Sequence, residues 1–164
     1  MLRMNALPDV PRWAVLAAHA VPLITLPSGL WRIGVALGLP LADYRPVGWE
    51  AVYVVGLSVV AEALALLTLG LVRAWGEAVP RWVPLLGGRR VPPRAAVVPA
   101  LTGAAGLAAL CAWSFYAQYA GLGEGSIGTP AQDLLLVVCY VPLLAWPPLL
   151  VAVTVAYRRR RATA

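Results

Sequence analysis

The sequence contains few charged side chains, no lysine, a single histidine and two cysteines. Charged residues make up 12% of the chain, about half the share of a typical soluble domain, whereas 61% of the residues are hydrophobic. A soluble domain of 164 residues has no interior large enough for that much apolar surface. The composition therefore excludes an ordinary soluble domain and indicates a chain whose outer surface faces lipid.

Motifs of well-known chemistry are also missing. Cys111 and Cys139 lie inside apolar stretches, and no CxxC pair or Cys/His cluster is present, so neither a disulfide framework nor a zinc site is expected. The chain lacks HExxH, a phosphate-binding loop and a Ser/His/Asp set. The glycines in 121–125 are no dinucleotide fingerprint, because no βαβ unit surrounds them. We therefore expect no metal and no cofactor, and we assign no catalytic residue.

What is present is long apolar stretches. Four segments have the roughly 20 mostly apolar residues that a spanning helix needs: 13–39, 51–72, 95–120 and 134–157. None alternates with period two, as a strand of a membrane barrel would. The sequence predicts an all-α polytopic membrane protein, a single antiparallel four-helix transmembrane bundle that comprises the whole chain.

Prolines interrupt two of these segments. Pro22 and Pro27 lie in the first, and Pro142 and the pair 147–148 lie in the fourth. Each proline removes a backbone hydrogen bond and clashes with the preceding turn, so we expect kinks in both helices. Whether the first helix is kinked or fully broken near Pro27 stays open.

The arginines are divided unevenly between the two sides of the predicted bundle. Eleven lie in the N-terminal stretch, the loop 73–94 and the tail 158–164, and only Arg32 and Arg45 lie on the other side. By the positive-inside rule, both termini face the cytoplasm, in a multi-pass protein of the bacterial cytoplasmic (inner) membrane. Because the arginines sit between hydrophobic segments, they indicate orientation rather than nucleic-acid binding. The basic residues with this topogenic or lipid-facing role include Arg81, Arg89, Arg90, Arg158, Arg159, Arg160 and Arg161.

A few polar side chains fall inside the predicted spans, and charges at membrane depth are costly unless they pair. At a rise of about 1.5 Å per residue, Glu62 lies about 17 Å from the outer end of its helix, near the middle of the bilayer. Arg32 is interpreted as its ion-pair partner, as a residue that reaches the outer headgroups, or as part of a ligand-binding or transport site. Glu62 either fixes the helix register or binds a proton or cation, and His19 is either a packing residue or a proton relay. The intramembrane polar candidates are His19, Ser28, Arg32, Glu62 and Gln118.

Small residues recur at helical spacing in two spans. Gly34 and Gly38 are four residues apart in the first, and Gly103 and Gly106 lie together in the third. Membrane helices associate where small residues let their backbones approach closely. These glycines therefore predict helix-packing faces, whose partner belongs either to the same chain or to another.

Three stretches carry a family resemblance: HAVPLITLPSGLWRIGVALG (19–38), LALLTLGLVRAWGEAVPRWVPLLGGRRVPP (64–93) and CYVPLLAWPPLLVAVTVAYRRR (139–160). They resemble an uncharacterised group of small four-span integral membrane proteins from high-GC actinobacteria. The resemblance implies an inner-membrane location. It assigns neither an activity nor a functional residue.

Three functional classes agree with this pattern. The first is the handling of a small solute or lipid by an oligomeric helix bundle, with a polar site around Glu62 and Arg32. The second is an accessory or assembly subunit that docks on a larger membrane complex through its small-residue faces. The third is an intramembrane enzyme with His19 and Glu62 as an acid/base pair. The bilayer is the one partner that the sequence itself indicates.

Overall fold

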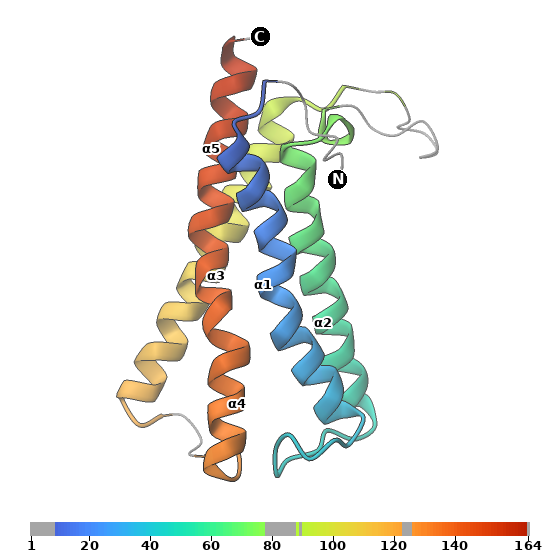
Figure 1. Ribbon diagram of the computed structural model, residues 1–164, viewed down its shortest axis with the longest axis vertical. Helices are drawn as coiled ribbons and strands as arrows, with labels where there is room; N and C mark the ends of the chain where they lie inside the picture. Colours follow the sequence, from blue (N-terminus) through green and yellow to red (C-terminus); the bar gives the residue numbers. More distant parts are fainter. Residues whose placement is uncertain (1–8, 78–87, 89, 123–125, 164) are drawn as a thin grey trace.

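The computed structural model describes residues 9–77, 88, 90–122 and 126–163, and it confirms the all-α prediction. Its helices are α1 (Arg12–Ala36), α2 (Trp49–Leu67), α3 (Pro93–Tyr119), α4 (Pro130–Tyr140) and α5 (Trp146–Thr163). Three short 3₁₀ segments join them: η1 (Thr68–Leu71), η2 (Ala74–Gly76) and η3 (Val141–Ala145). The helices form an elongated bundle (Figure 1).

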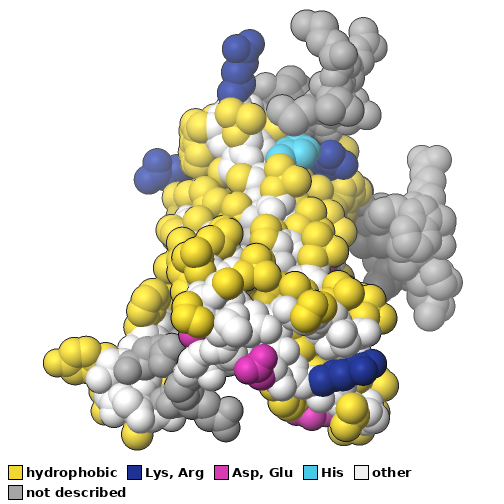
Figure 2. Space-filling model, turned by 60° about the horizontal axis from the view of Figure 1, so that its bottom comes forward, with side chains coloured by type: hydrophobic (Ala, Val, Ile, Leu, Met, Phe, Trp, Pro, Cys, Tyr) yellow, Lys and Arg dark blue, Asp and Glu magenta, His cyan; other side chains and the backbone are white. Residues whose placement is uncertain are grey.

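Four helical stretches are long and apolar enough to cross a membrane: Arg12–Ala36, Trp49–Leu71, Pro93–Ala117 and Pro130–Ala162. This confirms a multi-pass membrane protein. The start of α1 and the end of α5 lie at the same end of the bundle (Figure 1). We call this the basic end, because it carries Arg12, Arg73, Arg90, Arg94 and the 158–161 arginines, and we call the opposite one the far end. Hydrophobic side chains cover most of the face visible in Figure 2.

The helix α1 is the centre of the bundle and packs against α2, α4 and α5. Its buried residues follow a spacing of alternately four and three, which places them on one side of a helix. They include Ala14, Ala18, Val21, Thr25 and Ser28. Several of these side chains are small, so neighbouring helices approach α1 closely, as small residues allow in membranes.

Proline acts differently in the first and fourth spans. Pro22 and Pro27 lie inside α1, which continues as one α-helix through both, so no full break occurs there. In the fourth span, α4 ends at Tyr140, the 3₁₀ segment η3 contains Pro142, and α5 starts at Trp146. The predicted proline-dependent irregularity of the fourth span is therefore a 3₁₀ interruption between two α-helices.

The helix α3 is the least covered span. Only 6% of its apolar window is buried, against 44% for α1. Its helix contacts are with α5, and toward the far end it diverges from α4 (Figure 1). Most of the surface of α3 therefore faces lipid.

Two sequence signals shape the far end. The helix α4 begins with a capping box, in which Thr129 accepts from the Gln132 amide and the Gln132 side chain accepts from the Thr129 amide. The helix α1 ends at Ala36 and is capped by Gly38, which has a φ of 83°; Gly38 N donates to Val35 O and Leu39 N donates to Gly34 O. This is the hydrogen-bond pattern of a Schellman cap, in which glycine avoids the penalty of a positive φ.

Candidate functional site

A groove of about 450 Å³ lies between the end of α2, the first half of α3 and the start of α5. Its volume is within the range of small-molecule sites. Apolar and small side chains dominate the walls. The lining residues include Leu67, Leu71, Trp75, Ala96, Ala100, Gly103, Leu107 and Leu150.

Gly103 and Gly106 of α3 face the groove or open space, whereas Ala104 is buried in the core. A Cβ atom on Gly103 or on Gly106 would meet no atom within 4 Å, and Gly103 lines the groove. In α1, a Cβ on Gly34 would lie 2.6 Å from Leu41 Cδ1 in the following loop. Gly38 lies beyond the end of α1 and faces the Arg45 side chain. The atoms nearest to a Cβ on Gly34 or Gly38 belong to the following loop, and a Cβ on Gly103 or Gly106 meets none, so the packing of these glycines against another helix stays a prediction.

Two buried hydrogen-bond donors border the groove without a partner in the described part of the chain. The hydroxyl of Thr68 and the indole nitrogen of Trp146 are both buried and unpaired. Thr68 is 3% exposed and Trp146 is 5% exposed. An unmade hydrogen bond at a buried polar group costs about 1–3 kcal/mol. Both atoms are closed to solvent, so these unmade hydrogen bonds lie inside the packed wall of the groove rather than at its open surface.

Two arginines adjoin the lining of the groove at the basic end. Arg90 and Arg94 are exposed, and they adjoin the groove-lining residues Val91 and Ala95 in the sequence. Arg94 is in the first turn of α3, where unpaired backbone N–H groups add partial positive charge. The groove is thus apolar along its length and basic at this end.

An ion-pair cluster joins the end of α5 to Glu77 at the basic end. Arg160 Nη2 lies 2.7 Å from Glu77 Oε1, and Arg161 Nη1 lies 3.8 Å from Glu77 Oε2. Arg161 Nη2 also donates to the Val91 carbonyl at 3.2 Å, and Val91 N donates to Glu77 O. These two arginines therefore have a protein partner in addition to the topogenic role that the sequence predicts. Arg158 and Arg159 are exposed.

We expect Glu77→Gln to loosen the end of α5. The ion pairs are partly exposed, so their loss should cost about 1 kcal/mol, the upper limit for surface pairs. That is roughly a fivefold rise in the open population of the α5 tail, with a matching rise in its rate of trypsin cleavage. Glu50→Gln, on an exposed residue at the far end, is the control. An unchanged cleavage rate in Glu77→Gln would contradict this role.

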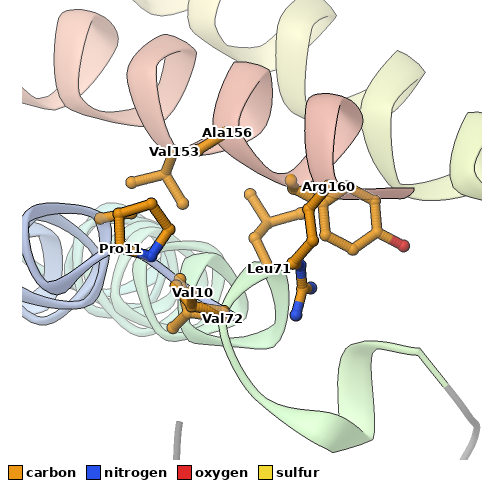
Figure 3. Close-up of a pocket in the computed structure, with 9 residues that line it drawn as sticks. Val10, Pro11, Leu71, Val72, Val153, Ala156 and Arg160 are labelled. Carbon is orange, nitrogen blue, oxygen red and sulfur yellow. The ribbon is translucent and has the colours of Figure 1, made fainter. Parts of the chain in front are cut away.

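The contact between the start of α1, the end of η1 and α5 is tightly packed. Figure 3 shows Val10 and Pro11 facing Leu71, Val153 and Arg160 across this contact. The cavity left there is about 10 Å³, at the lower limit of the space that one water molecule needs. The basic end therefore has no open passage at this contact, and the larger space is the groove at α3.

Glu62 contacts Thr25 of α1 in the membrane interior. Thr25 Oγ1 lies 2.7 Å from Glu62 Oε2, 2.9 Å from Pro22 O and 3.3 Å from Val21 O. Ser28 is fully buried on the same side of α1, and its hydroxyl donates to Thr25 O at 2.9 Å. Ser28 was among the polar candidates and Thr25 was not, because the rotation of α1, which is not visible in the sequence, decides which hydroxyl faces Glu62.

Arg32 does not pair with Glu62. Its guanidinium carbon lies 5.8 Å from the ring centre of Tyr140, and Trp31 meets the same ring edge-on at 5.7 Å. The two residues of α1 thus hold Tyr140 at the end of α4 by a cation–π and an aromatic contact. Of the three roles left open for Arg32, the ion pair is absent from the described structure, which shows this contact between α1 and α4 in its place.

His19 is hydrogen-bonded on both ring nitrogens. Nδ1 lies 2.7 Å from Val15 O, and Nε2 lies 3.1 Å from Arg73 Nη2. A carbonyl only accepts and a guanidinium only donates, so these contacts fit a neutral ring with the proton on Nδ1. The structure does not bring His19 to Glu62, as an acid/base pair would require.

Some predicted residues lie outside the description. Arg81 and Arg89 are not among the described residues, and neither is the side chain of Gln118. Thr68 and Trp146 could not be identified from the sequence. They carry no charge, and only the structure shows that their hydrogen-bond donors are buried without a partner. Sequence reasoning also missed Glu77, although this residue is the acidic group within the basic loop.

Comparison with known proteins identified no relative of this chain. No protein-family model matches the chain, and no curated protein and no solved structure is detectably similar to it.

Proposed function

We propose that this protein binds a membrane lipid in the groove between α2, α3 and α5. The observation that carries the proposal is a groove of about 450 Å³ with apolar walls, whose lining residues Val91 and Ala95 adjoin two exposed arginines in the sequence. An anionic lipid has the complementary chemistry. Its acyl chain fits the apolar walls, and its phosphate pairs with Arg90 and Arg94.

The length of the groove supports a lipid of one leaflet. Its lining on α3 extends from Ala95 to Leu107. At a rise of about 1.5 Å per residue this is about 18 Å. Half of the hydrocarbon core of a bilayer is about 15 Å thick. A chain in the groove therefore extends from the headgroup layer to about the middle of the bilayer.

We place the protein in a bacterial cytoplasmic membrane with the basic end inside. The bias of arginines supports this orientation through the positive-inside rule. A cysteine at Arg158 should react with an impermeant maleimide only after the cells are opened, whereas a cysteine at Arg45 should react in intact cells. The opposite pattern would invert the orientation and would place the groove in the outer leaflet.

The test of lipid binding is native mass spectrometry of the protein from nanodiscs of equal phosphatidylglycerol and phosphatidylcholine. We expect retained phosphatidylglycerol. Since each arginine near a membrane surface contributes about 1 kcal/mol to anionic lipid binding, Arg90→Gln with Arg94→Gln should weaken retention roughly 25-fold. Arg45→Gln, at the far end, is the control and should change nothing. A protein that retains no lipid, or both lipids equally in all variants, would refute the proposal.

The exposure of α3 favours a second candidate function. This span has lipid-facing glycines and contacts only α5 closely. An accessory subunit would use that surface to dock on a larger membrane complex, and a homo-oligomer would use it on a second copy. In the same mass spectra, a stoichiometric second protein would support the accessory role, and a multiple of the chain mass would support the oligomer.

A further inference from the structure

The hydrogen bonds around Thr25 compete for one proton. A threonine hydroxyl has one proton to donate and two lone pairs that accept. Three oxygens lie within hydrogen-bond distance of Thr25 Oγ1, namely Glu62 Oε2, Pro22 O and Val21 O. The two carbonyls can only accept. The number of protons available for these hydrogen bonds therefore depends on whether the carboxyl group of Glu62 is protonated.

If Glu62 is ionised, one of the hydrogen bonds of Thr25 Oγ1 cannot form. A carboxylate only accepts, so it would take the single proton of Thr25, and the carbonyl contact at 2.9 Å would have no proton. A protonated Glu62 completes both contacts. Its O–H donates to Thr25 Oγ1, and Thr25 then donates to Pro22 O.

The position of Glu62 in the bilayer favours the same state. Glu62 is 13 residues from Trp49 and 9 from Leu71, the ends of the second span, which places it about 14–20 Å from either end. A lone carboxylate at that depth is costly. Among the described residues, the ion pairs are those of Glu77, while Arg32 lies on Tyr140 and Arg73 on His19. No cation in the described part of the chain therefore offsets a charge on Glu62.

The set of ligands suits a proton rather than a metal ion. The side-chain oxygens that meet here come from Glu62 and Thr25, and the hydroxyl of Ser28 is already used on Thr25 O. No group of three metal-binding acidic, histidine or cysteine side chains occurs in the described ranges. Hard cations such as Ca²⁺ require six to eight oxygens.

We infer that Glu62 is a proton-binding site inside the membrane, whose carboxyl group holds a proton and donates it to the hydroxyl of Thr25. When the proton leaves to water, the O–H bond of Glu62 breaks and the hydroxyl of Thr25 turns from Pro22 O to the new carboxylate. The contact between α1 and α2 thus changes its hydrogen bonds with the proton. Glu62 does not line the groove, so this site does not depend on lipid binding.

Infrared spectroscopy of the protein in lipid at neutral pH tests the inference. We expect a C=O stretching band of a protonated carboxyl group that disappears in Glu62→Gln and persists in Glu50→Gln. Thr25→Val should shift this band, because it removes the acceptor, whereas Thr25→Ser should leave it in place. A spectrum in which Glu62→Gln removes no such band would overturn the inference.

A second measurement uses only the wild-type protein, so it does not depend on the folding of a variant. Dicyclohexylcarbodiimide is an apolar reagent that attacks protonated carboxyl groups. The acid proton moves to the reagent nitrogen, and the acyl group stays bound to the reagent as an N-acylurea. We expect this adduct on Glu62 at neutral pH. An adduct that forms on Glu62 only after acidification would show that the reagent reaches an ionised group, and it would overturn the inference.

Discussion

Gly103→Leu is expected to expel the bound lipid and to leave the bundle folded. A Cβ on Gly103 meets no atom within 4 Å, so the new side chain enters the groove without moving the chain. It would displace about three methylene groups of the lipid, at about 0.8 kcal/mol each. The retention of lipid in native mass spectra should fall roughly 50-fold.

Gly106→Leu is the matched control for this variant. Gly106 is one turn further along α3, it also has open space around its Cβ, and it is not among the residues that line the groove. Equal loss of lipid in both variants would place the lipid on the outer surface of α3. Unchanged retention in Gly103→Leu would remove the groove as the binding site.

Gly76→Ala is expected to destabilise the turn between η1 and η2. A methyl group on Gly76 would overlap the backbone of Gly70, which cannot move aside as a flexible side chain would. The turn must open, at a cost of about 3 kcal/mol, the upper range for overpacked sites. Both glycines line the groove, so the variant should also lose lipid.

Gly56→Ala is expected to stabilise the protein. Gly56 is inside α2, and a Cβ there meets nothing within 4 Å. Alanine in a helix interior is favoured over glycine by about 0.5–1 kcal/mol. Equilibrium unfolding in mixed micelles should therefore show a lower free energy of unfolding for Gly76→Ala and a higher one for Gly56→Ala. Equal values for Gly76→Ala and the wild type would show that the two backbones do not touch.

The sequence was sufficient for the spans because hydrophobicity and helix length are local properties. It predicted four apolar helices and the irregular fourth span, and the structure has both. It left a break near Pro27 open, whereas α1 is continuous. A proline in a membrane helix ends it only where neighbours cannot satisfy the freed backbone groups, and those neighbours are not visible in the sequence.

The polar candidates were visible in the sequence, but their contacts were not. Glu62 and Arg32 stand out as charges in apolar segments. Their partners, Thr25 and Tyr140, depend on how α1 is rotated and where α4 ends. Gly103 and Gly106 predicted close contact between helices, but the same small residues leave open space when no neighbour approaches. The groove follows from that packing and could not be predicted from spacing alone.

The sparse contacts of α3 also bear on how the chain folds. The α1–α2 pair is local in sequence, and α3 pairs with α5, which follows it. Two hairpins can therefore form independently, the first while the rest of the chain is still being synthesised. The contact of α1 with α5 joins residues far apart in sequence and links the hairpins. Assembly should then be slow at this one step, and a chain stopped before it would contain two intact hairpins that have not yet docked.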